Sequence, residues 1–271
     1  ASNSYGFDID GKGDGLRILK DATSAVDQGV DFSKYDFVTV IAPATSGYFT
    51  KGGAMTFGAG GYRTSEKLFH QGIVIGSDKS FDFTLPSNGW LMMSHEIGHL
   101  LGMKHPYDQS SKSNWQNVPW DLMGNGGTST PEYLGWTRFL MGWLKAINIK
   151  CLSDSNVGSS NFKISGINNQ GNLEKLLLVK ISKTKAVAIE SRKSGKYNNL
   201  RAAEEGVLVY LVDTAKQDDQ GIIKVLGDSQ LKHEGQLTGL LRTNDSVTYG
   251  NISVRVKSIG KDSDEVQVTI G

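Results

Sequence analysis

The first third of the chain alternates between amphipathic and wholly apolar segments. Residues 16–29 (LRILKDATSAVDQG) place apolar side chains about one helical turn apart, which predicts a short amphipathic helix. Residues 37–42 (FVTVIA) and 73–75 (IVI) are instead short, rich in β-branched residues and almost wholly apolar. Runs of this kind are typical of strands covered on both faces. The pattern therefore predicts a helix followed by two buried strands.

Two more helices are expected further along. Residues 90–101 carry an apolar stripe and follow Ser87 and Asn88, either of which is a favourable N-cap. The stripe comprises Trp90, Met93, Ile97, Leu100 and Leu101. A Ser-Thr-Pro sequence at 129–131 is typical of a helix start, and this helix is predicted to run to about Lys145. Its apolar face, which we expect in the core, comprises Leu134, Phe139, Leu140, Trp143 and Leu144.

After residue 150 the pattern changes to short segments rich in β-branched residues, separated by turns of Asn, Gly, Asp and Ser. These segments are 173–181, 185–192, 206–213, 221–227, 252–259 and 265–270. Such spacing predicts an antiparallel sandwich-like domain. The polar stretch 151–161 is interpreted as a linker. The chain is thus predicted to be α+β, with one domain at 1–148 and an all-β domain at 149–271.

Composition narrows the class of protein. The 271 residues have a formal net charge of +1 with both signs evenly mixed, so we expect no nucleic-acid partner. No apolar run approaches the length of a membrane span. The polar start ASNSYGFDID does not read as a signal peptide, which favours a trimmed, mature chain. Cys151 is the single cysteine, which excludes an internal disulfide; we expect a small structural thiol, not a redox switch.

The string HEIGHLLGMKH carries the strongest chemical signal. His95 and His99, four residues apart on a helix, project from one face and can reach a single ion, while Glu96 is rotated by roughly 100°. Gly102 permits the positive φ that ends the helix, so that His105 can close a site of three imidazoles. A fourth position then remains for water, which indicates a catalytic zinc ion, with Glu96 as the general base.

This HExxHxxGxxH string resembles the signature of the metzincin clan of zinc peptidases. The resemblance implies a catalytic domain with a mixed, twisted sheet, an active-site helix and a closing helix. It also implies a Met-containing turn beneath the zinc, which Met123 in WDLMGNGG matches. Some members carry a Tyr two residues after that Met, but Asn125 stands here, so no catalytic Tyr is assigned. The clan's edge strand pairs with extended substrate; Met55 and Phe57 lie either on such a strand or in a loop.

Within the clan, the chain is similar to the immune inhibitor A-like bacterial secreted peptidases. The similar segments are 30–42, 95–108, 120–127, 131–144, 187–200 and 205–213. Many members read GxxD where this chain has Gly102 and His105, so a neutral nitrogen ligand replaces an anionic one. The resemblance implies a secreted endopeptidase acting on protein or peptide substrates, and a monomer is expected by default. A further alternative is an enzyme specialised for glycosylated substrates, with the β domain aiding recognition.

Other polar residues have alternative interpretations. Asp8, Asp10 and Asp14 resemble a calcium loop, but Leu19 stands where the twelfth-position Glu is required, so a turn is favoured over structural calcium. Asp108 and Asp121 are either carboxylates that orient a ligand His or turn residues. In the C-terminal half, Glu190, Arg192 and His233 are interpreted as surface or structural residues.

A second function remains open from sequence. The chain would then be a binding or adhesion module, with a purely structural zinc and a β domain that grips a glycan or protein. The intact Glu96 argues against it, because a structural zinc has no use for that carboxylate.

Overall fold

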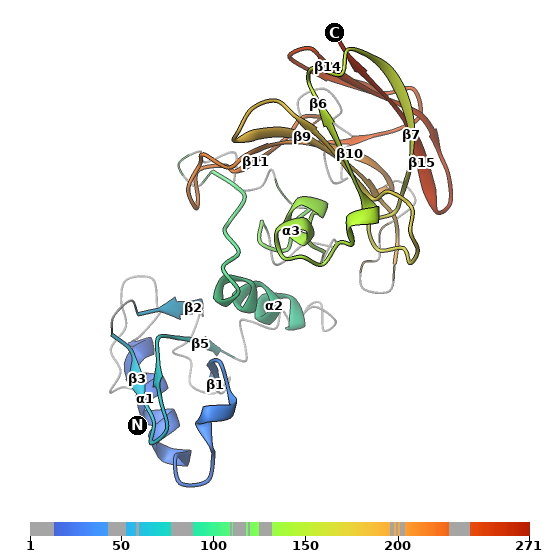
Figure 1. The fold of residues 1–271 in the computed structure, drawn as a ribbon. Coiled ribbons are helices and arrows are strands. Elements are labelled where there is room, and N and C mark those ends of the chain that lie inside the picture. Colours follow the sequence, from blue (N-terminus) through green and yellow to red (C-terminus); the bar gives the residue numbers. More distant parts are fainter. Residues whose placement is uncertain are drawn as a thin grey trace. The chain divides into compact units, whose positions relative to one another are not determined.

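The computed structural model describes residues 14–42, 53–57, 60–76, 89–108, 110, 118, 120–124, 132–195, 198, 200, 204–227 and 239–271. Internal contacts divide the chain into two compact units, Ala1–Met103 and Lys104–Gly271. Helices and sheets occur together along the chain (Figure 1), so the mixed α+β composition is confirmed. The predicted domain boundary at residue 148 differs from this division by contacts and stays a prediction.

The first helix, α1 (Gly15–Val26), confirms the amphipathic segment predicted from residue 16, but it ends three residues early. Ile18 and Leu19 are buried on its inner face. Its N-cap is Asp14, whose side chain accepts a hydrogen bond of 3.0 Å from the backbone N–H of Arg17. Asp14 therefore caps a helix, while Asp8 and Asp10 lie outside the described residues.

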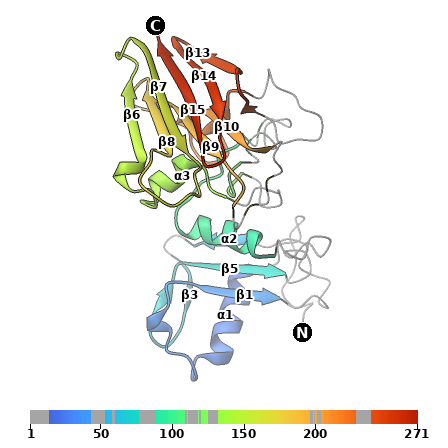
Figure 2. The ribbon, with the colours of Figure 1, turned by 90° about the vertical axis from the view of Figure 1, so that its right-hand side faces the viewer.

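The N-terminal unit is built around β5 (Gln71–Gly76), which pairs in parallel with β1 (Val38–Ala42) and antiparallel with β2 (Gly53–Thr56). Figure 2 shows α1 and α2 (Gly89–Leu100) on opposite faces of this sheet. α1 contacts β1 and β5, whereas α2 contacts β2 and β5. The predicted buried strand at 73–75 is confirmed, because helices cover both faces of β5. Met55 lies on β2, and Phe57 directly follows it.

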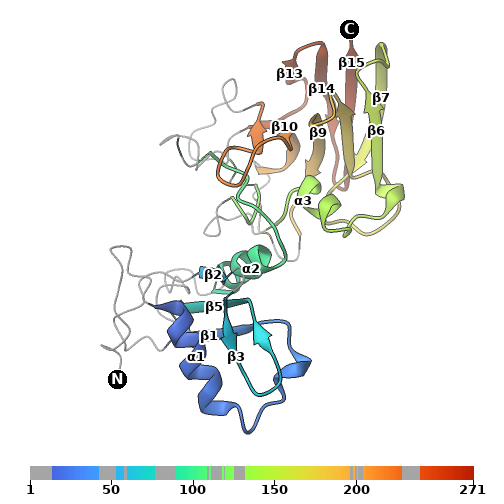
Figure 3. The same cartoon turned by 60° about the vertical axis from the view of Figure 1, so that its left-hand side comes forward.

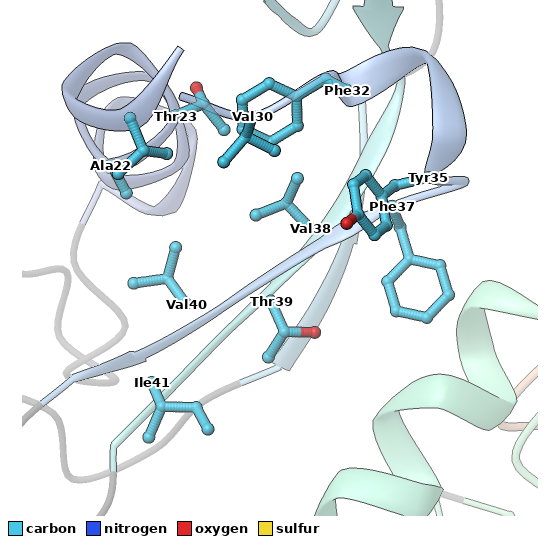
Figure 4. A pocket seen from close by; sticks show the side chains of 11 residues that line it. Ala22, Thr23, Val30, Phe32, Tyr35, Phe37, Val38, Thr39, Val40 and Ile41 are labelled. Carbon is cyan, nitrogen blue, oxygen red and sulfur yellow. The ribbon is translucent and has the colours of Figure 1, made fainter. Parts of the chain in front are cut away.

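The expectation that residues 37–42 are covered on both faces is wrong for the described part of the chain. Val38 and Val40 point toward α1, while Thr39 and Ile41 point the other way (Figure 4). The side chain of Ile41 is 52% exposed, since α2 covers β2 and β5 and not β1. A hollow of about 470 Å³ beside β1 is lined by aliphatic, aromatic and Thr side chains, without a His or a carboxylate, so it carries no acid–base chemistry.

A small hairpin and one 3₁₀ turn complete the described part of this unit. β3 (Tyr62–Arg63) pairs antiparallel with β4 (Leu68–Phe69), and the rings of Tyr62 and Phe69 are stacked with centroids 5.2 Å apart. Phe32, in the 3₁₀ turn Phe32–Lys34, packs edge-on against Phe69. These aromatic side chains join α1 in one apolar cluster.

Two sheets form most of the C-terminal unit. The first has the order β11-β10-β9-β8-β6, with β12 also paired to β10. Its strands are β6 (Ile149–Ser153), β8 (Leu176–Lys180), β9 (Lys185–Arg192), β10 (Gly206–Asp213), β11 (Ile223–Val225) and β12 (Leu240–Leu241). The second has the order β13-β14-β15-β7. Its strands are β7 (Gly158–Ser165), β13 (Ser246–Tyr249), β14 (Ile252–Ile259) and β15 (Ser263–Ile270).

The first sheet is buried on both faces. Figure 3 shows the strands of the two sheets beside each other. Alternate residues of the first sheet, such as Leu177 and Ile189, share one apolar core with Val254 and Val266 of the second. The intervening residues, such as Tyr210, face the other way and pack against side chains from the segment that precedes β6. These side chains come from Val118, Trp120, Leu134, Trp136 and Leu144. Strands covered on both sides explain the continuous apolar runs in this half of the sequence.

The strand predictions were incomplete, because they did not include β3, β4, β6, β7, β12 or β13. Residues 151–161, interpreted as a linker, lie on β6, the following turn and β7. The first half of β7 is exposed although it pairs with β15, so its polar sequence did not indicate a strand. β6 pairs in parallel with β8, whereas an antiparallel arrangement was expected.

The predicted helix up to Lys145 is also shorter than expected. Residues 129–131 lie outside the described residues, and α3 spans only Gly135–Leu140. Gly142, with φ of +69°, ends it: the N–H of Trp143 donates to the carbonyl of Arg138, and that of Gly142 to the carbonyl of Phe139. A 3₁₀ turn follows at Ala146–Asn148. Leu134 is buried as predicted, but Leu140 and Trp143 are 63% and 49% exposed.

Among the residues that the structure describes, none of the helices combines the length and apolar character needed to cross a membrane.

The shared core of the two sheets predicts the effect of truncating Ile189. Ile189 is fully buried between the sheets, so Ile189→Ala should lower the free energy of unfolding by about 2–5 kcal/mol. Val157→Ala is the matched control because Val157 is 74% exposed, and it should change stability by less than about 0.5 kcal/mol. Urea unfolding followed by circular dichroism measures both values. Equal losses would contradict the arrangement of the core.

Candidate metal centre

α2 holds two imidazoles in mutual contact. The Nε2 atoms of His95 and His99 lie 3.1 Å apart, and the rings meet edge to face with centroids 4.8 Å apart. Two ligands on a tetrahedral zinc, with bonds of about 2.0–2.1 Å, are separated by about 3.3 Å. The pair therefore presents two nitrogens at the spacing that a single zinc ion requires.

Gly102 ends α2 immediately after this pair. Its φ is +87°, and its N–H donates to the carbonyl of His99, while the N–H of Met103 donates to the carbonyl of Gly98. These two bonds form a Schellman motif, which needs a left-handed residue at this position. The prediction that Gly102 turns the chain is confirmed.

The same turn orients His99. Its Nδ1 lies 3.1 Å from the carbonyl oxygen of Met103, the residue directly after the helix-ending glycine. A carbonyl accepts only, so the contact favours the proton on Nδ1 and leaves the Nε2 lone pair for a ligand. The helix end thus sets both the direction of the chain and the tautomer of a candidate ligand.

His105 follows within the same continuous segment of chain. His95, His99 and His105 each offer a nitrogen, and these atoms all lie within 4.8 Å of one another. These residues could hold a metal ion, and their assignment as ligands stays a prediction. Three imidazoles suit zinc, and they leave a fourth tetrahedral position open.

Glu96 lies between the two helical imidazoles in sequence, and its side chain is only 6% exposed.

The apolar face of α2 differs from the predicted stripe. Leu91 is buried on this helix, whereas Leu101, predicted to face the core, is 50% exposed because it stands in the turn that ends the helix. The side chain of Trp90, together with Ser87 and Asn88, lies outside the described residues.

Met123 is buried in a tight turn in the C-terminal unit. Asp121, fully buried, organises this turn: one of its oxygens accepts from the N–H of Met123, and the other accepts from the N–H of Leu134 and the hydroxyl of Thr137. Burial raises the pKa of Asp121, while these hydrogen bonds and the charge of Arg192 oppose the increase. Asp121 therefore joins the Met123 turn to α3.

Glu190 and Arg192 are both fully buried, so the structural interpretation is right and the surface one is wrong. Arg192 Nη1 donates to Glu190 across 2.9 Å, and Nη2 donates to the carbonyl of Trp120. Desolvation acts to lower the pKa of Arg192, but the charges of Glu190 and Glu132 raise it overall. Glu190 also accepts hydrogen bonds from the N–H of Gly135 and the hydroxyl of Tyr210. This ion pair therefore ties the strand to the segment that contains Met123.

Asp108 forms a β-bridge with Gln220 and accepts hydrogen bonds from the N–H and the hydroxyl of Ser110, which fits a turn role. The carboxylates beside His105 are instead Asp218 and Asp219, which the sequence interpretation missed. They lie in a turn more than a hundred residues further along the chain, and no local pattern relates them to the motif.

Asn125 and His233 lie outside the described residues, and Cys151 is exposed on β6.

Comparison with known proteins points to the same segment. Residues 3–106 match the model of the metallo-peptidase family M12B, reprolysin-like, and this range includes all three imidazoles and Glu96. No curated protein and no solved structure matches the chain. The match supports a metallopeptidase, although it covers less than half of the chain. It does not show the specific similarity to immune inhibitor A-like peptidases.

The Schellman turn yields a matched pair of substitutions. An added Cβ would meet no described atom within 4 Å at Gly102 or at Gly142, so each Gly→Ala change strains only the left-handed backbone. Both should lower the free energy of unfolding by about 1–2 kcal/mol. Only Gly102→Ala should also weaken zinc binding, measured by competition with a chelating dye. Equal zinc affinity in the two variants would contradict a role for this turn in the site.

The Asp121 contacts predict unequal costs for two neighbouring substitutions. Asp121→Ala leaves two backbone N–H groups and a hydroxyl without their acceptor. It should lower the free energy of unfolding by about 3 kcal/mol or more. Thr137→Val removes one of these hydrogen bonds together with its donor, and should lower the free energy of unfolding by about 1 kcal/mol. Urea unfolding distinguishes the two values, and similar costs would argue against Asp121 as the organiser of the turn.

Proposed function

We propose that the chain is a zinc-dependent endopeptidase, with His95, His99 and His105 as the metal ligands and Glu96 as the general base. The observation that carries the proposal is the separation of 3.1 Å between the Nε2 atoms of His95 and His99, with His99 oriented by the carbonyl of Met103. The reprolysin-like match over residues 3–106 supports the same class of enzyme.

The donor set fits zinc. Neutral imidazole nitrogens are common zinc ligands, and three of them with an open fourth position are typical of a catalytic ion. When bound, zinc supplies a Lewis acid that polarises a peptide carbonyl and lets water lose a proton near neutral pH. His95 and His99 would hold the ion from α2, and His105, which follows the turn at Gly102, would be the third ligand.

Glu96 moves the proton in this proposal. The Glu96 carboxylate takes a proton from water and later donates it to the amine of the leaving half of the substrate. Its side chain is 6% exposed, and exclusion of bulk water strengthens the interaction of a carboxylate with a nearby cation. Glu96, His95 and His99 all lie on α2, so the proposed base and two of the three proposed ligands share one helix.

β2 is the proposed binding edge for extended substrate. It is the outer strand of the described sheet order β1-β5-β2, and it lies on the side of the sheet that α2 contacts. Backbone pairing with an edge strand gives affinity with little dependence on side chains. Met123 is proposed as the Met of the turn beneath the zinc.

The remaining parts of the proposal concern the wider protein. The C-terminal sheets are interpreted as a sandwich-like domain that assists recognition of protein substrates, glycosylated ones included. Secretion and membership of the immune inhibitor A-like group follow from the resemblance of sequence segments in both halves of the chain. A purely structural zinc in a binding module is the competing function.

The test separates metal binding from turnover. Glu96→Gln should keep its zinc but lower the rate of peptide cleavage by roughly 10²–10⁴-fold, because the base is lost and the ligands are not. His99→Ala should lose zinc. His70→Ala is the matched control, since His70 is an exposed imidazole on the N-terminal unit whose Nδ1 contacts the carbonyl of Gly60.

Elemental analysis of the purified variants and mass-spectrometric mapping of bonds cut in a peptide library provide the two measurements. Zinc in the wild-type protein without any chelator-sensitive cleavage would favour the binding module. Full cleavage by Glu96→Gln would remove Glu96 from its proposed role.

A further inference from the structure

Two carboxylates lie beside the third imidazole. Nδ1 of His105 is 3.0 Å from an oxygen of Asp219 and 3.6 Å from an oxygen of Asp218. The side chains of His105 and Asp219 are 21% and 33% exposed, so their contact is partly shielded from water. His105 therefore differs from His99, whose Nδ1 faces a neutral backbone carbonyl.

The backbone around His105 is fixed to the same turn. The N–H of His105 donates to Asp218 across 2.6 Å. The N–H groups of Gly221 and Ile223 donate to the carbonyls of Tyr107 and Pro106, at 2.8 and 3.0 Å. This short ladder connects residues 105–108 to the turn between β10 and β11, so the position of His105 depends on the strand pair that flanks the turn.

Asp219 also has an unusual backbone. Its φ is +61°, in the left-handed region, and it is one of two non-glycine residues with positive φ in the described chain. Such a conformation is unfavourable for a residue with a Cβ and persists where the surroundings determine it. Here it accompanies a carboxylate directed at a candidate metal ligand.

We propose that Asp219 is a positioning residue for the metal ligand His105. Its carboxylate oxygen lies 3.0 Å from Nδ1 of His105, close enough to take the Nδ1 proton in a hydrogen bond once the ring turns to present the Nε2 lone pair to zinc. The negative charge of Asp219 also offsets part of the charge of a dication bound by three neutral imidazoles. Asp218 holds the backbone of the same residue. This inference rests on the proposed function of the three-imidazole site.

The experiment compares zinc affinity in the full-length variants Asp219→Ala, Asp219→Asn and Asp262→Asn, by competition with a chelating dye. Loss of an outer-shell partner typically weakens metal binding 10–100-fold, so we expect that loss in Asp219→Ala. Asp219→Asn keeps an acceptor oxygen but not the charge, so its zinc affinity should lie between those of Asp219→Ala and the wild-type protein. Asp262→Asn is the control, because it changes an exposed carboxylate elsewhere in the same unit.

Two readouts distinguish positioning from general destabilisation. The melting temperatures of the metal-free variants should remain close to that of the metal-free wild type, and the visible absorption of the cobalt-substituted protein should change in Asp219→Ala. Unchanged zinc affinity and cobalt spectrum in Asp219→Ala would overturn the proposal, as would a loss of affinity fully matched by a loss of apo stability.

One further outcome concerns a different location of the ion. His105, Asp218 and Asp219 also form a group whose ligand atoms lie within 4.8 Å of one another. If the double variant His95→Ala, His99→Ala kept wild-type zinc affinity and Asp219→Ala abolished it, the carboxylate would be a direct ligand and the positioning role would be wrong. Absence of zinc binding by the wild-type protein would instead count against the proposed function itself.

Discussion

The left-handed backbone at Gly102 is the constraint on which the candidate site depends. A continuing α-helix would carry residue 105 further along the helix axis by about 1.5 Å per residue, away from the His95 and His99 pair. The positive φ instead ends α2, and the same turn directs the carbonyl of Met103 at Nδ1 of His99. One backbone conformation therefore controls both the path to the third imidazole and the orientation of the second.

The C-terminal unit supplies a rigid frame for the residues that follow this turn. Its first sheet is covered on both faces, by the second sheet on one side and on the other by the side chains of Val118, Trp120, Leu134, Trp136 and Leu144. The buried ion pair of Glu190 and Arg192 joins the sheet to that segment through Gly135 and Trp120. Removing one member of such a pair leaves an uncompensated buried charge, so these contacts require both residues.

The local elements followed closely from the sequence where burial is continuous. α1, β5, α2 and the six apolar strand segments were recognisable, because a helical or alternating apolar period directly reflects which side chains are buried. β7 was missed because its exposed half has a polar sequence, although its backbone pairs fully with β15. α3 was predicted too long, because its exposed Leu140 and Trp143 continue an apolar period beyond the glycine that ends the helix.

The amino-acid sequence alone determined the candidate donor set, because the spacing of His95, Glu96 and His99 on a helix and the glycine before His105 are local properties of one short segment. It also indicated which strands form the buried sheets. Only the tertiary structure decided what surrounds these residues. Asp219 reaches His105, and Asp121 reaches Met123 and Leu134, through folding that brings together side chains with no periodic relation in sequence. Hydrogen bonds and ion pairs of this kind depend on the position of each atom, whereas hydrophobic periodicity reports only which face of an element is buried.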